Sequence, residues 1–352
     1  MPITATDSIA PALEHTKQQL FRPFRIGQWT KLAFVGLLAG ELGANGCNRS
    51  NFHIPRHGAT PHMAWPGPLG IDHALLALLI AFAVVAGFSI GIILMYVSSV
   101  MRFVLFDSII ARECRIRRSW SQRLGPGWRY FVWKLLYILL TAAAIAGLVG
   151  IPLAFAFTSG WFREPKEHLP ALVLGGIFAV MVLAAFFVVT AVVLVLTKDF
   201  VIPQMALEDI DAMEGWRRLW AMMKAEKEAY AAYIGVKIVL AIVVGILIAI
   251  ATLILGLMIA VPSVAFGILA VVTGKAAGLT WNPGTIALAA TIGLTLLAGF
   301  FYLVSLVAVP AIVFFPAYSI YFFASRYPQL SAALHATSPA PSFPPGAAAL
   351  RT

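Results

Sequence analysis

The stretch "ALLALLIAFAVVAGFSIGIILMYVSSVM", residues Ala74 to Met101, contains no charged side chain. A helix needs about 20 predominantly apolar residues to cross a hydrocarbon core that is roughly 30 Å thick. This stretch exceeds that length, and the first charge after it is Arg102. The stretch therefore predicts a transmembrane helix and assigns the chain to the integral membrane proteins.

The rest of the chain has the same character, because 61% of its 352 residues are hydrophobic and only 11% are charged. Soluble domains are usually about 45–50% apolar and about 25% charged. We predict an all-α polytopic membrane bundle of about six transmembrane helices, one of them short. The predicted spans are residues 30–44, 74–101, 135–161, 169–197, 238–261 and 285–325.

Prolines and short runs leave parts of this assignment open. Pro262 is expected to end the span 238–261, so that Ser263–Thr273 is an interfacial or re-entrant piece. Pro310 and Pro316 should kink the last span rather than end it, because buried neighbours can satisfy the freed backbone groups. Leu32–Leu42 is short for a span and carries Glu41 near its end, where an interfacial position is favoured over a buried functional one.

The distribution of positive charge predicts the orientation. If residues 30–44 span, 20 of the 25 Lys and Arg residues fall on one side and five on the other. Cytoplasmic loops carry the excess of Lys and Arg, so both termini are expected in the cytoplasm of a bacterial cell, with the protein in the inner membrane. The predicted domains are then a cytoplasmic segment 1–29, a membrane domain 30–327 and a disordered tail 328–352 rich in Pro, Ala and Ser.

Two surface segments separate the spans, and the second, 204–228, has the clearer pattern. Apolar residues recur every three or four positions, acids come early and bases come late, which complements a helix dipole. It therefore predicts an amphipathic helix on the cytoplasmic membrane surface. Packing against the ends of the spans is an equally acceptable interpretation of the same stripe.

The same segment carries a family resemblance through five residues: Pro203, Glu208, Glu214, Trp220 and Lys224. Their order and spacing resemble a pattern in bacterial multi-pass proteins related to the membrane domain of glycerophosphodiester phosphodiesterases. The membrane domain of that family is not its catalytic part. The resemblance therefore implies a type of membrane fold and no phosphodiesterase activity.

The first surface segment is rich in arginine, with a predicted interfacial helix over 107–123. Its basic residues are Arg112, Arg115, Arg117, Arg118, Arg123 and Arg129. Each basic side chain near an anionic membrane surface contributes about 1 kcal/mol of attraction. A strip held between two spans has little reach toward nucleic acid, so we expect these arginines to contact anionic lipid and no nucleic acid to bind. The same arginines are also consistent with a purely topological role.

A weak internal repeat relates the two surface segments. "FVLFDSII" (Phe103–Ile110) and "FVIPQMAL" (Phe200–Leu207) each follow a long apolar run and open a surface segment that leads to another run. This pattern predicts two units of span, surface segment and span in the same orientation. Coincidence in an apolar sequence is the alternative.

The sequence contains few motifs that are typical of metal binding or catalysis. His53, His57 and His62 lie near Cys47, and imidazoles at such spacing can bind zinc or copper, but the segment fits no fixed ligand motif. We therefore expect a solvated loop, no metal and no cofactor. No GxSxG or HExxH motif is present, and Glu41 is the one acid inside a predicted span.

These observations favour a non-enzymatic membrane protein, structural or accessory, that engages lipid or a membrane partner; a protein partner or a second copy stays open. The alternative is a transporter or channel for an apolar or amphipathic solute. A transporter should show a polar central cavity. An accessory protein should show a tightly packed bundle or a groove that opens to lipid.

Overall fold

The computed structural model describes residues 3–41, 73–161, 168–278 and 282–336, and every regular element in them is a helix. In chain order these are α1 (Ile9–Phe21), α2 (Ile26–Leu38), α4 (His73–Ile110), α5 (Ile116–Gln122), α6 (Leu124–Thr158), α7 (Leu169–Leu196), η1 (Thr197–Val201), α8 (Ile202–Glu208), α9 (Ala212–Ala225), α10 (Lys227–Ala276), α11 (Pro283–Ala324) and α12 (Pro328–Ala336). Five of the described helices, with α7 to α8 counted as one, are long and apolar enough to cross a membrane. The predicted all-α membrane bundle is confirmed.

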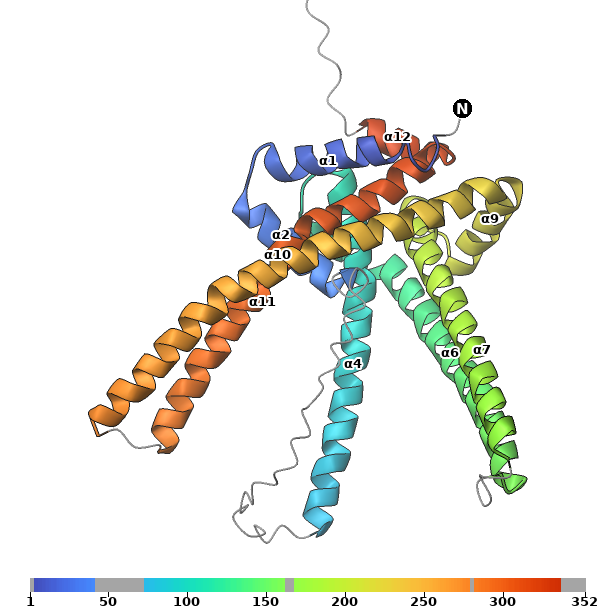
Figure 1. The fold of residues 1–352 in the computed structure, drawn as a ribbon. Coiled ribbons are helices and arrows are strands. Elements are labelled where there is room, and N and C mark those ends of the chain that lie inside the picture. The colour runs from blue at the N-terminus through green and yellow to red at the C-terminus, as the bar shows by residue number, and fades with distance from the viewer. Residues whose placement is uncertain (1–2, 42–72, 162–167, 279–281, 337–352) are drawn as a thin grey trace, which may run out of the picture.

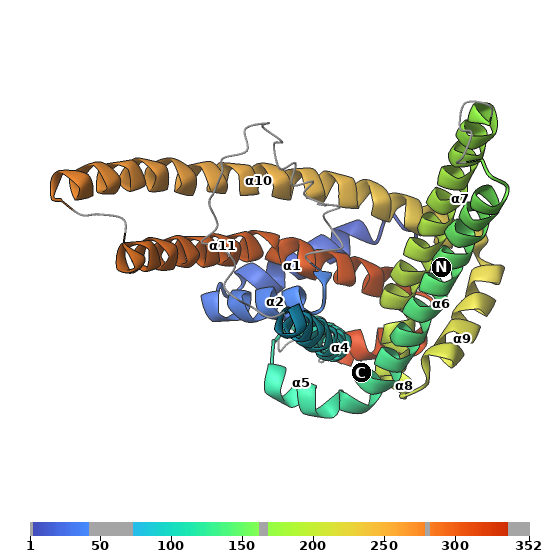
Figure 2. The ribbon, with the colours of Figure 1, turned by 90° about the horizontal axis from the view of Figure 1, so that it is seen from below.

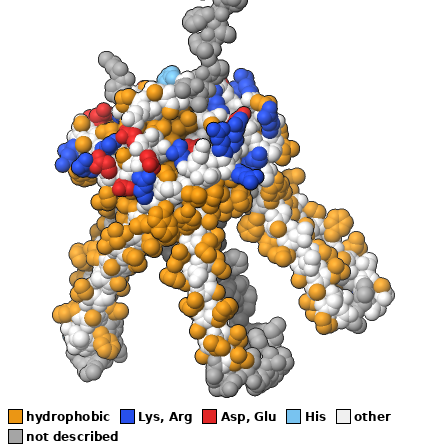
Figure 3. Space-filling model, turned by 180° about the vertical axis from the view of Figure 1, so that it is seen from behind, with side chains coloured by type: hydrophobic (Ala, Val, Ile, Leu, Met, Phe, Trp, Pro, Cys, Tyr) orange, Lys and Arg blue, Asp and Glu red, His pale blue; other side chains and the backbone are white. Residues whose placement is uncertain are grey.

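The long helices form three legs that diverge from one head (Figures 1 and 2). The legs are α4, the pair α6 and α7, and the pair α10 and α11. The head contains α1, α2, α5, η1, α8, α9, α12 and the adjoining ends of the long helices. Charged side chains gather on the head, while hydrophobic side chains cover the legs (Figure 3). The legs therefore have surfaces suited to lipid, and the head has a surface suited to water.

The head has an aromatic core built around Phe200. Its ring packs against Tyr233 at a centroid distance of 5.0 Å and against Phe323 at 5.1 Å. Tyr233 in turn stacks on Tyr318, at 5.2 Å with the rings nearly parallel. These side chains come from η1, α10 and α11, and all are fully buried. The core thus fastens the legs together only at the head, since almost no side chain of the long apolar windows is buried, except in α11.

The predicted span 30–44 is a shorter helix. At 1.5 Å per residue the 13 residues of α2 cover about 20 Å, less than the roughly 30 Å of a hydrocarbon core. Gly40 has φ +79°, a left-handed conformation that ends a helix and suits glycine. The two ends of the described chain nevertheless meet at the head, where Arg326 Nη1 donates to the Ile3 carbonyl at 3.1 Å. Helix α4 runs from the foot of its leg up into the head (Figure 1).

The predicted break at Pro262 is wrong. Helix α10 continues through Pro262 to Ala276 and includes Ser263–Thr273 without interruption. Between Lys237 and Lys275 it has no charged residue, an uncharged length of about 37 residues or about 55 Å. Such a helix fits a core of roughly 30 Å only when it is strongly tilted.

The predicted interfacial helices and tail also need correction. Residues 107–110 belong to α4, and Arg112 at φ +55° separates them from the seven-residue α5. Residues 204–228 divide into α8, α9 and the start of α10, with Asp209 in a left-handed conformation at the first break. The predicted disordered tail begins with the helix α12, and residues 337–352 lie outside the described part.

Candidate functional site

A π-helical turn, η1, joins the α6–α7 leg to the head. Pro203 has no N–H to donate to the carbonyl of Asp199, so a regular α-helical ladder fails at this point. The Ile202 N–H instead bonds to the Thr197 carbonyl, five residues back. Single π-turns inside helices are frequent at functional sites. Here the turn carries Lys198 and Asp199, the first charged residues after the uncharged part of α7.

Two buried ion pairs meet at η1. The Lys198 ammonium pairs with the Glu41 carboxylate, and the Lys237 ammonium pairs with the Asp199 carboxylate. Asp199 also accepts a hydrogen bond from the Tyr233 hydroxyl at 2.9 Å. The two carboxylate side chains are 2% and 1% exposed, so each depends on its partner to offset the loss of hydration. Glu41 is therefore buried inside the protein, while its predicted depth at the membrane interface stays a prediction.

The two pairs border a small polar cavity of about 30 Å³, which Arg102 and Ser319 also line. That volume is enough for one or two water molecules. Arg102 is half-buried, and its Nε has no hydrogen-bond partner among the described residues. The cavity is too small for an organic substrate.

A second, much larger space lies between α10 and α11. It has a volume of about 950 Å³ and is lined mainly by apolar side chains, including Ile248, Leu257, Leu296 and Phe300. It is a groove that opens sideways on the leg rather than a closed chamber. Glu41 lines both the groove and the polar cavity, so the apolar space reaches up to the buried charges.

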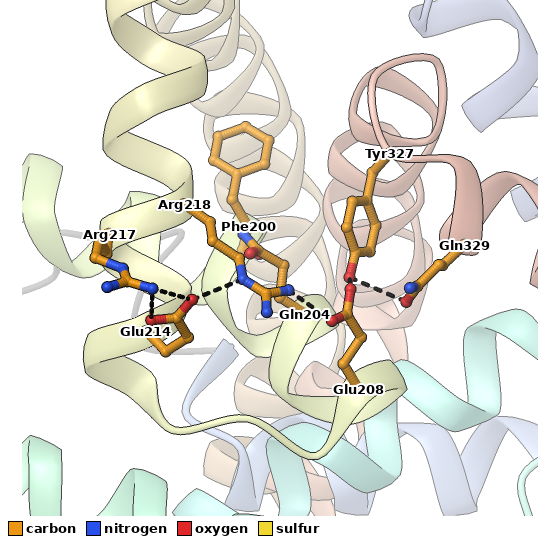
Figure 4. A network of polar contacts seen from close by, with 8 residues as sticks. All are labelled: Phe200, Gln204, Glu208, Glu214, Arg217, Arg218, Tyr327 and Gln329. Atoms are coloured by element: carbon orange, nitrogen blue, oxygen red, sulfur yellow. Dashed lines mark hydrogen bonds and ion pairs between the residues drawn. The ribbon is translucent and has the colours of Figure 1, made fainter.

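Two residues of the family-like pattern, Glu208 and Glu214, belong to a clasp of polar contacts at the edge of the head (Figure 4). Arg218 binds Glu208 at 2.5 Å and Glu214 at 2.9 Å, and so ties α8 to α9. The Tyr327 hydroxyl donates to Glu208, which ties both helices to the start of α12. Hydrogen bonds from Arg218 and Arg217 lower the pKa of the Glu214 carboxyl. Partial burial, followed by the hydrogen bond to Glu208, raises the pKa of Tyr327.

The other members of that pattern lie apart from this clasp. Pro203 is buried beside the polar cavity, where it causes the π-turn. Trp220 is 54% exposed on α9, and the Lys224 ammonium lies 5.7 Å from the centre of its ring. The exposed Trp220 and Met213 give α9 the apolar face predicted for an interfacial helix. The pattern thus has architectural roles in three places and forms no catalytic constellation among the described residues.

The six arginines of the first surface segment divide into two groups. Arg123 binds Asp107 through two hydrogen bonds of 2.8 and 2.9 Å, and Arg129 binds Asp209 at 2.5 Å. Arg112 donates to Gln18 at 3.0 Å. The others lie on or beside α5: Arg115, which pairs with Glu113 in an exposed contact, and Arg117 and Arg118, which are exposed and form no ion pair with a described residue. Three of the six arginines are thus exposed on or beside α5, and the predicted contact of the six with lipid stays a prediction.

No group of three or more His, Cys, Asp or Glu residues in the described part could hold a metal ion. His53, His57 and His62 lie outside the described residues, as does Cys47, so their predicted lack of metal stays a prediction. Cys114 is buried in the head, and this burial raises the pKa of its thiol. A buried thiol of this kind is chemically inert.

Sequence reasoning missed the charges around η1. The signal was present, because Arg102, Lys134, Lys198 and Lys237 each stand at the head-side end of a long uncharged run. What the sequence did not show is that Glu41 and Asp199 pair with two of them, because those contacts join residues far apart in the chain.

Splayed apolar legs, a charged head and buried ion pairs at their junction define a polytopic α-helical membrane protein. The chain belongs to a family of unknown function, DUF7544, whose profile matches residues 3–333. No curated protein and no solved structure matches it. The resemblance to the phosphodiesterase membrane domains stays a prediction.

Proposed function

We propose that this protein is a non-enzymatic membrane protein that engages lipid, and that the groove between α10 and α11 holds acyl chains. The observation that carries the proposal is the shape and lining of that groove. Its volume of about 950 Å³ falls in the range of sites for small amphiphiles, about 300–1,000 Å³. Its opening faces sideways on the leg, as expected for a ligand that enters from the bilayer.

The energetics favour an acyl chain as the occupant. Burial of apolar surface contributes about 0.8 kcal/mol per CH₂ group. The few polar groups of the lining, such as Thr252 and Ser263, are too sparse to orient a polar solute along the groove. A lipid tail therefore fits the lining better than a water-soluble substrate does.

We assign the surface contact with anionic lipid to α5. Arg115, Arg117 and Arg118 are exposed on or beside one short helix of the head. At about 1 kcal/mol each they contribute at most about 3 kcal/mol at low salt, and less at physiological salt, where the Debye length is about 8 Å. This contact steadies the head on the cytoplasmic leaflet of a bacterial inner membrane.

Photocrosslinking tests the groove. A phospholipid with a diazirine in its acyl chain should label peptides of α10 and α11 in the wild type. Gly293 lines the groove with open space around it, so Gly293→Trp should fill the groove and reduce that labelling. Gly299→Trp is the matched control, because Gly299 also has open space on α11 but does not line the groove. Equal labelling of the three proteins contradicts the proposal.

Transport of an amphipathic solute is the second candidate function. The observation in its favour is that Glu41 lines both the groove and the cavity beside two ion pairs. Charged groups at membrane depth often belong to solute or proton pathways. Flux of a fluorescent lipid between the leaflets of proteoliposomes measures this function. Transport is supported if the flux exceeds that of protein-free vesicles and falls in Glu41→Gln, and is rejected if neither occurs.

A further inference from the structure

The two units of the internal repeat share a structural motif in the head. In the first unit the ring of Phe103 packs against Tyr130, at a centroid distance of 6.1 Å. In the second unit Phe200 packs against Tyr233 at 5.0 Å. Each tyrosine is followed four residues later by a lysine that precedes a long uncharged run. These lysines, Lys134 and Lys237, are therefore equivalent positions on α6 and α10.

The two units differ at the residue just before each phenylalanine. In the second unit it is Asp199, which pairs with Lys237 and accepts a hydrogen bond from Tyr233. In the first unit it is Arg102. The Phe103–Tyr130 contact places Lys134 and Arg102 in the arrangement that Lys237 and Asp199 have in the second unit. The second unit thus contains its own counter-anion, whereas the first has two cations in the same arrangement.

No described residue neutralises the first unit. Glu41 and Asp199 line the same small cavity as Arg102, and each is already paired with a lysine. The Nε of Arg102 is buried without a hydrogen-bond partner, and Lys134 forms no ion pair with a described residue. Two cations held together at partial burial are costly unless an anion joins them.

The position of the two cations indicates where that anion comes from. Arg102 follows the uncharged run of α4, and Lys134 precedes the uncharged run of α6. Helices α4 and α6 both run into the head (Figure 1), so the head-side ends of their uncharged runs, where Arg102 and Lys134 stand, mark the change from apolar leg to charged head. In a bilayer this is the depth of the phospholipid headgroups. Both side chains are half-buried rather than sealed, so a ligand can reach them between the legs.

We propose that a phospholipid with an anionic headgroup binds at α4 and α6, its phosphate bridging Arg102 and Lys134 in the place that the Asp199 carboxylate takes in the other unit. The guanidinium can donate two parallel hydrogen bonds to phosphate oxygens, and the ammonium adds a point charge. The inference rests on the proposed function only in that both ligands are lipids, since this site is separate from the groove between α10 and α11.

Native mass spectrometry of the detergent-purified full chain tests the site. Wild-type protein titrated with phosphatidylglycerol should retain one tightly bound molecule, and phosphatidylcholine should bind more weakly. Arg102→Gln and Lys134→Gln should each weaken retention about tenfold or more, as expected for the loss of one hydrogen bond to a charged group. Arg102→Lys keeps the charge and should retain most of the binding.

Arg102→Asp distinguishes loss of the lipid site from loss of folding. Its new carboxylate should pair with Lys134 as Asp199 pairs with Lys237, so the protein should stay folded without lipid and lose its response to phosphatidylglycerol. Arg117→Gln with Arg118→Gln is the control for surface charge and should leave the retained molecule in place. Gly293→Trp, which fills the groove, should also leave it in place, so the two lipid sites are tested independently.

Two results overturn the inference. One is equal retention of phosphatidylglycerol by the wild type, Arg102→Gln and Lys134→Gln. The other is equal thermal stabilisation of the wild type by phosphatidylglycerol and by water-soluble glycerol phosphate, which would identify a soluble phosphate as the ligand instead of a lipid.

Discussion

His15 is a buried histidine that joins α1 to two of the legs. Its Nε2 lies 3.1 Å from the Ile109 carbonyl of α4, and its Nδ1 lies 3.2 Å from the Tyr321 hydroxyl of α11. The neutral ring satisfies both contacts when Nε2–H donates and Nδ1 accepts. Burial, followed by the nearby charge of Arg112, lowers the pKa of His15 below its usual 6.5. The histidine is therefore neutral in the folded head.

This predicts that acid destabilises the head. The unfolded chain takes up a proton on His15 near pH 6.5, while the folded chain resists until a lower pH, so stability is full above 6.5 and falls below it. The free energy of unfolding should decrease by up to about 1.4 kcal/mol per pH unit between pH 6.5 and the lowered pKa. Thermal melting in detergent from pH 8 to pH 5 measures this decrease.

The matched variants are His15→Gln and His335→Gln. Glutamine at position 15 has no titrating proton, so its melting temperature should depend less on pH in this range. His335 is exposed on α12, and its replacement should leave the wild-type profile unchanged. If His15→Gln keeps the full acid dependence, another group is responsible.

At the scale of elements, Gly215 allows α9 to lie directly on the π-turn. A Cβ atom at this position would come within 2.8 Å of the Val201 Cγ1. Gly215→Ala should therefore destabilise the protein by about 1–3 kcal/mol through overpacking. Thermal or chemical unfolding in detergent gives the change, and Val201→Ala in the same chain should restore much of the loss.

Gly235→Ala is the control for this substitution. Gly235 lies inside α10 with no atom within 4 Å of its added Cβ, so alanine should be neutral or slightly stabilising, by up to about 1 kcal/mol. If Gly235→Ala and Gly215→Ala unfold alike, close packing on the π-turn is not the cause.

The sequence predicted the long elements well because hydrophobic length alone specifies a membrane helix. The prediction was wrong for the surface helices, where the backbone conformation of one residue ends a helix. Arg112 and Asp209 adopt left-handed conformations that nothing in their residue type requires, and they divide the predicted surface helices. Pro262 shows the reverse case, since a helix break predicted from residue type is absent in α10.

At the scale of the whole molecule, the distribution of Lys and Arg predicts that the head lies on the cytoplasmic side of the membrane. Lys275 lies in the last turn of α10, and this end of the helix is at the foot of the α10–α11 leg, opposite the head that carries α5 and α9 (Figure 1). In a chain with Cys47 and Cys114 replaced by serine, Lys275→Cys should react with an impermeant thiol reagent added outside cells.

Ser121→Cys and Ala225→Cys, both in the head, should react with that reagent only after the membrane is opened. Labelling of the head from outside in intact cells would reverse the proposed orientation. Protection of Lys275→Cys from outside would have the same meaning.

Contacts between distant parts of the chain set the limit of sequence reasoning about the site. Glu41 and Lys198 are far apart in sequence, and no periodicity relates them. The sequence shows the charged residues that end the apolar runs. It does not show which of these cations pair with a carboxylate, because that depends on how the legs converge at the head. The groove between α10 and α11 likewise results from helix arrangement rather than from a motif.

Because the uncharged part of α10 is longer than a bilayer core is thick, the tilt angle of the helix should depend on the thickness of the bilayer. Its uncharged part of about 55 Å would incline by about 60° in a core of about 27 Å and by about 53° in one of about 33 Å. Spin labels at Phe88 on α4 and Val264 on α10, both exposed, should therefore lie farther apart in short-chain than in long-chain lipid nanodiscs. Lys237, which pairs with Asp199, stands at the head-side end of this uncharged part, so we expect a change in the tilt of α10 to act on the buried ion pair.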